Sequence, residues 1–292
     1  MSIYKFVKFQ SQNFTVRTLC KVVKISRSSY YAWLTAQNNH VTTCIDEAVL
    51  ANVIFDIHKG SKCRYGAPRI HATLKKQGIP INKKKLVRLM KELSISGKCG
   101  RKKIRTTLRD HSAPLAKDMV QRDFTSLQPD KLWVGDITNI PTKEGWLFMS
   151  SVLDTCTRLI VGWSITDHMK TKICIDALAS AAMTRGKKTF PGTIFHSDHG
   201  SQYTSAEFKQ YLKKMKIVQS MGTVGDSYDN AMAESLWASL KREFVDDSNF
   251  TTKEEARLAV FEWVVWYNNS RSHSALDYMS PREYEKFLQY QK

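Results

Sequence analysis

The spacing of apolar residues changes from a period of two to a period of 3.6 within residues 129–292. Apolar and polar residues first alternate along three consecutive segments separated by short turns, which predicts an antiparallel meander of strands at 131–142, 146–154 and 159–166. Helical and strand-like patterns then follow one another. They predict helices at 170–186, near 205–215, around Glu234 and at 253–269, and strands at 193–198 and 217–221. The pattern alone therefore indicates an α/β domain with an antiparallel part.

The first third of the chain has helical periodicity instead. In residues 15–34, two short helices are predicted, and Ser26 is placed to cap the second one. In residues 65–93, Gly78 and a following proline separate two further helices, and Asn82 is placed to cap the latter. Both pairs are typical of helix-turn-helix modules, whose second helix enters the major groove of DNA. The first pair fits an ordinary helical hairpin with a polar face equally well.

These patterns divide the chain into parts. Residues 106–128 have little periodicity and precede the first clear strand, so we predict a linker there. On this basis we predict an N-terminal helix-turn-helix-like module at 1–50, a second, basic module at 51–105, and the α/β domain at 129–292.

The net charge of +18 is confined to one part of the sequence. Residues 1–128 contain 25 Lys and Arg against 7 Asp and Glu, whereas residues 129–292 contain 20 of each. A basic part beside a neutral one is expected of a protein that holds a polyanion such as DNA with the first. The candidate DNA contacts are Arg27, Ser28, Tyr30, Lys83, Lys84, Lys85, Arg88, Arg101, Lys102 and Lys103. The alternative for the second group is a charged helix face that contacts only solvent.

Composition excludes several other classes. The hydrophobic fraction of 42% is that of a folded protein, and no apolar run approaches the roughly 18 residues that span a bilayer. The N-terminus has no uninterrupted apolar signal region, so we expect a cytoplasmic protein. Six cysteines are scattered without a CxxC pair, which argues against a zinc ribbon and against a disulfide framework.

Three acidic residues stand out by their positions. Asp136 lies within the apolar strand WVGDITNI, where a charge is costly unless it is paired or bound to a metal. Asp198 closes another apolar strand, and 35 residues separate it from Glu234 on a predicted helix. Each has a simpler interpretation: a strand-end aspartate that accepts a hydrogen bond, a turn aspartate, and a solvated Glu–Lys helix face that includes Lys241.

Several motifs occur in a fixed order: WVGDIT, HSDHGSQYTS, GDSYDNAMAESLWASLKRE and YNNSRSHSALDYMSP. Together they resemble the second-frame (OrfB) transposases of the third insertion-sequence family, which are DDE transposases related to retroviral-type integrases. The resemblance extends from roughly residue 12 to residue 290. It implies an α/β ribonuclease H-like catalytic domain, a mixed sheet with flanking helices, preceded by all-α helix-turn-helix modules. A bacterial, nucleoid-associated protein is expected.

The resemblance also implies a site and a reaction. Asp136, Asp198 and Glu234 would hold two Mg²⁺ or Mn²⁺ ions, for which oxygen ligands are suited. Water would cut an element end, and the freed 3′-hydroxyl would attack a second phosphodiester. Lys241 would contact DNA. The implied partners are double-stranded DNA, further copies of the chain, and an upstream-frame helix-turn-helix/leucine-zipper protein or its frameshift fusion. No membrane partner is expected.

The neighbouring residues have supporting roles in this prediction. They are His196, Gly200, Gln202, Tyr203 and Asn230, with His196 more often a structural hydrogen-bonding residue than a ligand. Three further acids, Asp154, Asp167 and Asp226, are interpreted as structural or as supporting the metal ligands, because the family's motif does not assign them to the triad. The C-terminal residues Tyr267, Asn268, Arg271 and His273 are expected to pack the last helix against the sheet rather than to contact DNA.

Two other functions remain open at this point. The first is a DNA-binding regulator of transposition with a degenerate catalytic domain, although an intact set of carboxylates argues against it. The second is a ribonuclease H-type nuclease acting on RNA–DNA hybrids, although the helical DNA-binding modules argue against that.

Overall fold

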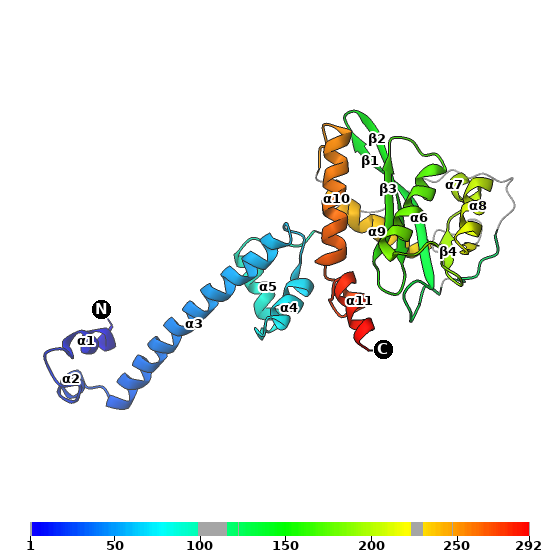
Figure 1. Cartoon of the computed structure of the whole chain (residues 1–292). Helices are drawn as coiled ribbons and strands as arrows, with labels where there is room; N and C mark the ends of the chain where they lie inside the picture. Colours follow the sequence, from blue (N-terminus) through cyan, green and yellow to red (C-terminus); the bar gives the residue numbers. More distant parts are fainter. Residues whose placement is uncertain (1, 99–115, 122, 223–229, 247, 292) are drawn as a thin grey trace. The chain divides into compact units, whose positions relative to one another are not determined.

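The computed structural model describes residues 2–98, 116–121, 123–222, 230–246 and 248–291, with the side chains of 36–45 left out. The chain forms two compact units, Met1–Gly97 and Lys98–Lys292, which are described separately (Figure 1). In the described part of the chain, no helix combines the length and the apolar character needed to cross a membrane.

The first unit is entirely helical. Its helices are α1 (Ile3–Gln10), α2 (Val16–Val22), α3 (Arg27–Gly60), α4 (Ala67–Lys76) and α5 (Lys83–Glu92). The two predicted caps are confirmed, because the Ser26 side chain accepts a hydrogen bond from Ser29 N and the Asn82 side chain accepts one from Lys84 N. Buried apolar residues of α4 and α5, such as Ile70 and Leu86, lie inward.

One sequence prediction for this unit is wrong. The second helix of the first pair is not short, because α3 runs for 34 residues and ends at Gly60. No Gly or Pro occurs earlier in that span, so nothing in the backbone stops the helix. The sequence prediction also omitted α1, whose Val7 packs into a small core with Leu19, Cys20 and Tyr30.

The second unit is built on a five-stranded mixed sheet. Its strands are β1 (Leu132–Thr142), β2 (Gly145–Asp154), β3 (Ile160–Thr166), β4 (Ile194–Ser197) and β5 (Val218–Met221). They lie in the order β3-β2-β1-β4-β5. The predicted meander is confirmed, since β1 to β3 pair antiparallel, and β4 then joins β1 in parallel with β5 on its far side. This is the ribonuclease H-like arrangement.

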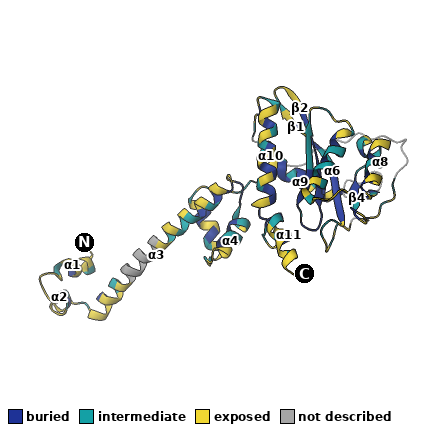
Figure 2. Cartoon of the chain, viewed as in Figure 1, coloured by how far each residue is buried: buried dark blue, intermediate teal, exposed yellow. Residues whose placement is uncertain are grey.

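Helices cover both faces of the sheet. The helices of this unit are α6 (Lys172–Arg185), α7 (Ser201–Thr204), α8 (Ala206–Lys214), α9 (Ala231–Leu240), the π-helix η2 (Lys241–Val245), α10 (Lys253–Asn269), η3 (Ser274–Leu276) and α11 (Pro281–Tyr290), of which α6, α8, α9 and α10 contact the sheet. Alternate residues of β1 separate two cores: Trp133 packs with α6 and α8, and Val134 with α9 and α10. Burial is accordingly concentrated between the sheet and these helices (Figure 2). A side chain at Gly162 would collide with α6, whose Ala177 O lies 2.2 Å from the ideal Cβ position.

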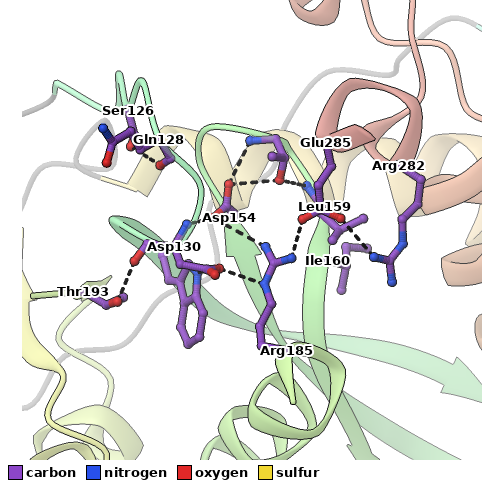
Figure 3. Close-up of polar contacts among 12 residues, drawn as sticks. Ser126, Gln128, Asp130, Asp154, Leu159, Ile160, Arg185, Thr193, Arg282 and Glu285 are labelled. Atoms are coloured by element: carbon purple, nitrogen blue, oxygen red, sulfur yellow. Dashed lines mark hydrogen bonds and ion pairs between the residues drawn. The ribbon is translucent and has the colours of Figure 1, made fainter. Parts of the chain in front are cut away.

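A buried arginine ties the ends of several elements together (Figure 3). Arg185, at the end of α6, forms ion pairs with Asp130 at 2.8 Å and with Glu285 of α11, and its Nη2 lies 3.9 Å from Asp154 Oδ2. Asp154 itself is fully buried and accepts hydrogen bonds from Asp130 N and Thr157 N. Its position supports the structural interpretation of this residue.

A second buried arginine joins α10 to the segment after α9. Arg271 is 5% exposed and forms a bidentate ion pair with Glu243 of η2, with N···O distances of 2.8 and 2.7 Å. It also contacts His273 and lies over the Tyr267 ring. Asn268 exchanges hydrogen bonds with both backbone groups of Ile160. These contacts confirm that the C-terminal motif packs the last helices.

We predict that Arg271→Ala lowers the free energy of unfolding by about 3–5 kcal/mol, because it leaves the Glu243 carboxylate buried without its partner. Urea denaturation of the full chain measures the change. The matched control is Arg242→Ala, because Arg242 is exposed and adjacent to Glu243, and its loss should change stability by no more than about 0.5 kcal/mol. Equal effects of the two substitutions would contradict the prediction.

Candidate active site

Asp136 lies in the middle of β1, the strand at the centre of the sheet. The preceding Gly135 is required by packing, because a Cβ there would lie 2.1 Å from the Phe195 ring. The carboxylate is half-buried. Its Oδ1 accepts a hydrogen bond from Ile137 N at 2.7 Å, and its Oδ2 accepts one from the Trp237 indole at 3.1 Å. Asp136 is therefore held on both oxygens.

Asp198 follows the last residue of β4. The parallel register pairs Leu132 with Ile194 and Val134 with His196, so continuing it two residues past the last pair, beyond the end of β4, sets Asp136 opposite Asp198. Neighbouring strands lie about 4.8 Å apart. Asp198 Oδ1 accepts a hydrogen bond from Gly200 N at 3.0 Å, which fixes the turn into α7. Sheet register thus brings the two carboxylates to neighbouring positions, and the charge of Asp198 acts on Asp136.

Glu234 occupies the first turn of α9. One residue before it and one residue after it anchor that helix to β1. Asn230 Nδ2 donates to Gly135 O at 3.3 Å, and Trp237 Nε1 donates to Asp136 Oδ2. Residues four before and three after Glu234 share its helix face. The half-buried Glu234 side chain therefore belongs to the face of α9 that meets β1 at Asp136.

The charges of Asp198 and Glu234 both act on the carboxyl group of Asp136. Burial raises the pKa of Asp136 to about 8, the charge of Asp198 adds to that effect, and Glu234 contributes a smaller increase. The hydrogen bonds from Ile137 N and Trp237 act in the opposite direction. Burial likewise raises the pKa of Asp198, opposed by its bond from Gly200 N. A cation at this position would relieve both the repulsion and the lost hydration.

The donor set has the chemistry that Mg²⁺ and Mn²⁺ require, because carboxylate oxygens are hard ligands. In the described residues, however, no three Asp, Glu, His or Cys side chains are grouped closely enough to hold one ion together. The pairing of β1 with β4 brings Asp136 and Asp198 to neighbouring positions. The packing of α9 on β1 brings Glu234 toward the same strand.

Each of the predicted supporting residues makes a different structural contact. His196 is buried and its Nδ1 lies 3.0 Å from Ser220 Oγ, which confirms its structural interpretation. Gly200 supplies the backbone N–H that binds Asp198. Gln202 donates to Met169 O at 2.9 Å, and Tyr203 is buried against Phe195 and Phe208. Asn230 anchors α9.

Other acids and histidines near the site are also placed. His199 Nε2 lies 2.5 Å from Gly222 O, so it connects the Asp198 turn to the end of β5. Asp167 is exposed and lies 3.8 Å from Lys253 Nζ. Asp226 lies outside the described residues. Lys241 is half-buried at the start of η2, seven residues after Glu234, and its DNA contact stays a prediction.

In the first unit, the structure corrects the assignment of Tyr30. Only 3% of its surface is exposed, and its ring packs against Trp33 and Tyr31, so it is a core residue and is not available to DNA. The sequence pattern missed this because α1, which completes that core, was not predicted. Arg27 and Ser28 are exposed at the start of α3, as a contact with DNA requires.

The candidate DNA contacts on α5 fall into two groups. Lys85 and Arg88 form ion pairs with Glu47 of α3 at 3.2 and 2.6 Å, and their hydrogen bonds lower the pKa of Glu47. Lys83 and Lys84 are exposed and, within the described residues, form no ion pair. Arg101, Lys102 and Lys103 lie outside the described residues.

Sequence reasoning missed one residue that contacts a candidate carboxylate. Trp237 lies three residues after Glu234, and its indole reaches Asp136 on another element. The signal was available in the spacing of SYDNAMAESLW, which places Asn230, Glu234 and Trp237 on one helix face. The partner of the indole was not available, because it depends on how the helix packs on the sheet.

Comparison with known families agrees with the fold. Residues 126–227 and residues 215–281 each match an integrase core domain family, and residues 45–122 match an HTH-like domain family. Among solved structures, a simian T-cell lymphotropic virus intasome in complex with PP2A regulatory subunit B56 gamma is similar over 78% of this chain and 72% of that chain. The TM-score is 0.46 and the sequence identity 16%.

Curated relatives match over most of their length. The transposase InsF for insertion sequence IS3A of Escherichia coli (strain K12) is 32% identical over 97% of this chain and 98% of the relative. The transposase for insertion sequence element IS904 of Lactococcus lactis subsp. lactis (strain IL1403) is 39% identical over 80% of this chain and 91% of the relative. With an integrase core and a relative aligned almost end to end, this chain belongs to the IS3-type family of insertion-sequence transposases.

Proposed function

We propose that this transposase cuts and rejoins DNA at the carboxylate site on β1, with Asp136, Asp198 and Glu234 as its catalytic residues. The observation that carries the proposal is the register of β1 and β4, which brings Asp136 level with Asp198. The helix that carries Glu234 is bonded to the same Asp136 through Trp237. Register and helix docking thus support a shared site for the three carboxylates.

The three carboxylates would hold divalent metal, for which we propose two Mg²⁺ or Mn²⁺ ions. Such ions, when bound, activate a water or a 3′-hydroxyl and stabilise the leaving oxygen. The chain's own residues supply ligands and orientation: Gly200 N and Ile137 N each fix one aspartate oxygen. Cleavage of an element end by water and transfer of the freed 3′-hydroxyl to a second phosphodiester both use this one site. No Ser or Tyr nucleophile is needed for either step.

The first unit would hold the DNA. Phosphate contacts by Lys and Arg supply sequence-independent affinity. The excess positive charge of the chain lies in residues 1–128, and Lys83 and Lys84 are exposed there. Arg27 and Ser28, exposed at the N-terminus of α3, are proposed to reach the major groove. Lys241, close to Glu234 in sequence, is proposed to contact DNA beside the reacting phosphodiester.

The proposal includes two protein partners. Joining two element ends requires two DNA-bound sites, so we propose that the chain acts as a homo-oligomer on DNA. The resemblance to OrfB proteins further suggests an upstream-frame partner or a frameshift fusion. An assay of end cleavage with and without that upstream protein tests the second point.

We predict that Asp136→Asn reduces cleavage of a terminal-repeat oligonucleotide to background while DNA binding in a gel-shift assay is retained. A neutral amide binds Mg²⁺ more weakly than a carboxylate does, so it cannot replace Asp136 as a ligand. Asp167→Asn is the matched control, because Asp167 is exposed and lies outside the site, and it should cleave normally. Cleavage by Asp136→Asn at the control rate would refute the assignment. An RNA–DNA hybrid, tested in parallel, should not be the preferred substrate.

We further predict that millimolar Mg²⁺ raises the melting temperature of the wild-type chain but not that of Asp136→Asn. A ligand that binds only the folded state stabilises it by mass action, by about 2.7 kcal/mol at a hundred times its dissociation constant. Thermal unfolding without DNA measures this. An equal increase in both proteins would place the ion elsewhere.

For DNA affinity, we predict that the double substitution Lys83→Ala/Lys84→Ala lowers the slope of log K against log salt concentration by about 2, one unit per lost phosphate contact. The control is Lys213→Ala/Lys214→Ala on α8, which removes the same charge from exposed positions within residues 129–292, the part of the chain with no net charge. Titrations at several salt concentrations give both slopes. A comparable loss in the two variants would contradict a specific role of α5.

A further inference from the structure

The indole of Trp237 is the side-chain donor that holds Asp136. Its Nε1 lies 3.1 Å from Asp136 Oδ2, and the backbone N of Ile137 lies 2.7 Å from Oδ1. Each oxygen of a carboxylate can accept two hydrogen bonds or ligands. The two donors therefore fix the plane of the carboxylate and still leave one lone pair on each oxygen.

The indole is itself held in place by packing. Trp237 is 6% exposed and belongs to the core between the sheet and α9 and α10, together with Val134 and Met149. A buried tryptophan N–H normally finds a partner, because leaving a donor unsatisfied is costly. Here the partner is a candidate metal ligand, and the donor comes from the helix that carries Glu234. A change in the position of α9 thus acts directly on Asp136.

We propose that Trp237 is a positioning residue for metal binding: its indole N–H orients the Asp136 carboxylate and couples that orientation to the helix that carries Glu234. This inference rests on the proposed function of the three carboxylates. It goes further by assigning a role to a residue that binds neither metal nor DNA. Groups that hydrogen-bond to metal ligands typically change metal affinity by about 10- to 100-fold when removed.

A second buried tryptophan provides the control for packing. Trp263 of α10 is 1% exposed and lies in the same core. Its Nε1 is buried and, within the described residues, has no hydrogen-bond partner. Replacing either residue by phenylalanine removes the same atoms from the same core, but only Trp237 loses a bond to Asp136.

The experiment compares wild type, Trp237→Phe, Trp263→Phe and Asp136→Asn as full chains without DNA. Binding of Mn²⁺ is measured from the electron paramagnetic resonance signal of the free ion, and folding is checked by circular dichroism. We expect Trp237→Phe to weaken Mn²⁺ binding by about 10- to 100-fold and Trp263→Phe to leave it unchanged. In cleavage assays, Trp237→Phe should raise the metal concentration for half-maximal rate more than it lowers the rate at saturating metal.

Each other result has a definite meaning. Unchanged Mn²⁺ binding by Trp237→Phe, or equal weakening by both phenylalanine variants, would overturn the inference while the carboxylate site stands. If Asp136→Asn binds Mn²⁺ as tightly as the wild type does, the proposed function is overturned instead. If Trp237→Phe does not fold, benzothienylalanine installed at position 237 keeps the ring and replaces only the N–H. Its Mn²⁺ affinity must then fall in the same way.

Discussion

Asp136 on β1 and Asp198 directly after β4 lie close enough for the charge of Asp198 to act on Asp136, and this pair of carboxyl groups is the centre of the candidate site. At about 4 Å, two unit charges repel by about 1 kcal/mol in water and by several times more near a protein surface. Burial is the larger cause that raises the pKa of Asp136 to about 8, and the charge of Asp198 adds to it. The donors Ile137 N, Gly200 N and the Trp237 indole offset only part of it. A divalent cation would remove the repulsion between the two carboxylates, and it would also replace the solvation that they lose on burial.

Such a site requires a rigid frame, since the fold must keep the two carboxyl groups together before any cation binds. Two buried arginines supply that frame away from the site. Arg271 fixes Glu243 in the π-helix directly after α9, so the helix with Glu234 is held at that end and by Trp237 along its length. Arg185 holds the start of β1, through Asp130, to α11. Because both arginines are paired, the positive charges that stabilise the frame do not compete for the carboxylates.

The sequence predicts most of this frame because strand and helix periods are local properties. Alternation located β1 to β3 to within one residue, and helical spacing gave α10 its observed bounds, 253–269. The candidate site needed more: only the parallel pairing of β1 with β4 brings Asp136 level with Asp198. The bonds of Trp237 to Asp136 and of Lys85 and Arg88 to Glu47 join segments far apart in sequence, so no local pattern contains them. The length of α3 was missed for the opposite reason, since it depends on the absence of a stop signal.

The distribution of charge follows from the same electrostatics. A cluster of lysines beside the three carboxylates would pair with them and displace the cation that the proposed chemistry requires. The excess positive charge lies instead in residues 1–128, and residues 129–292 are neutral by composition. Even within the first unit, Glu47 forms ion pairs with Lys85 and Arg88 of α5, whereas Lys83, Lys84 and Lys91 of that helix are exposed. Separating the charge that attracts DNA from the charge that binds metal allows one chain to use both.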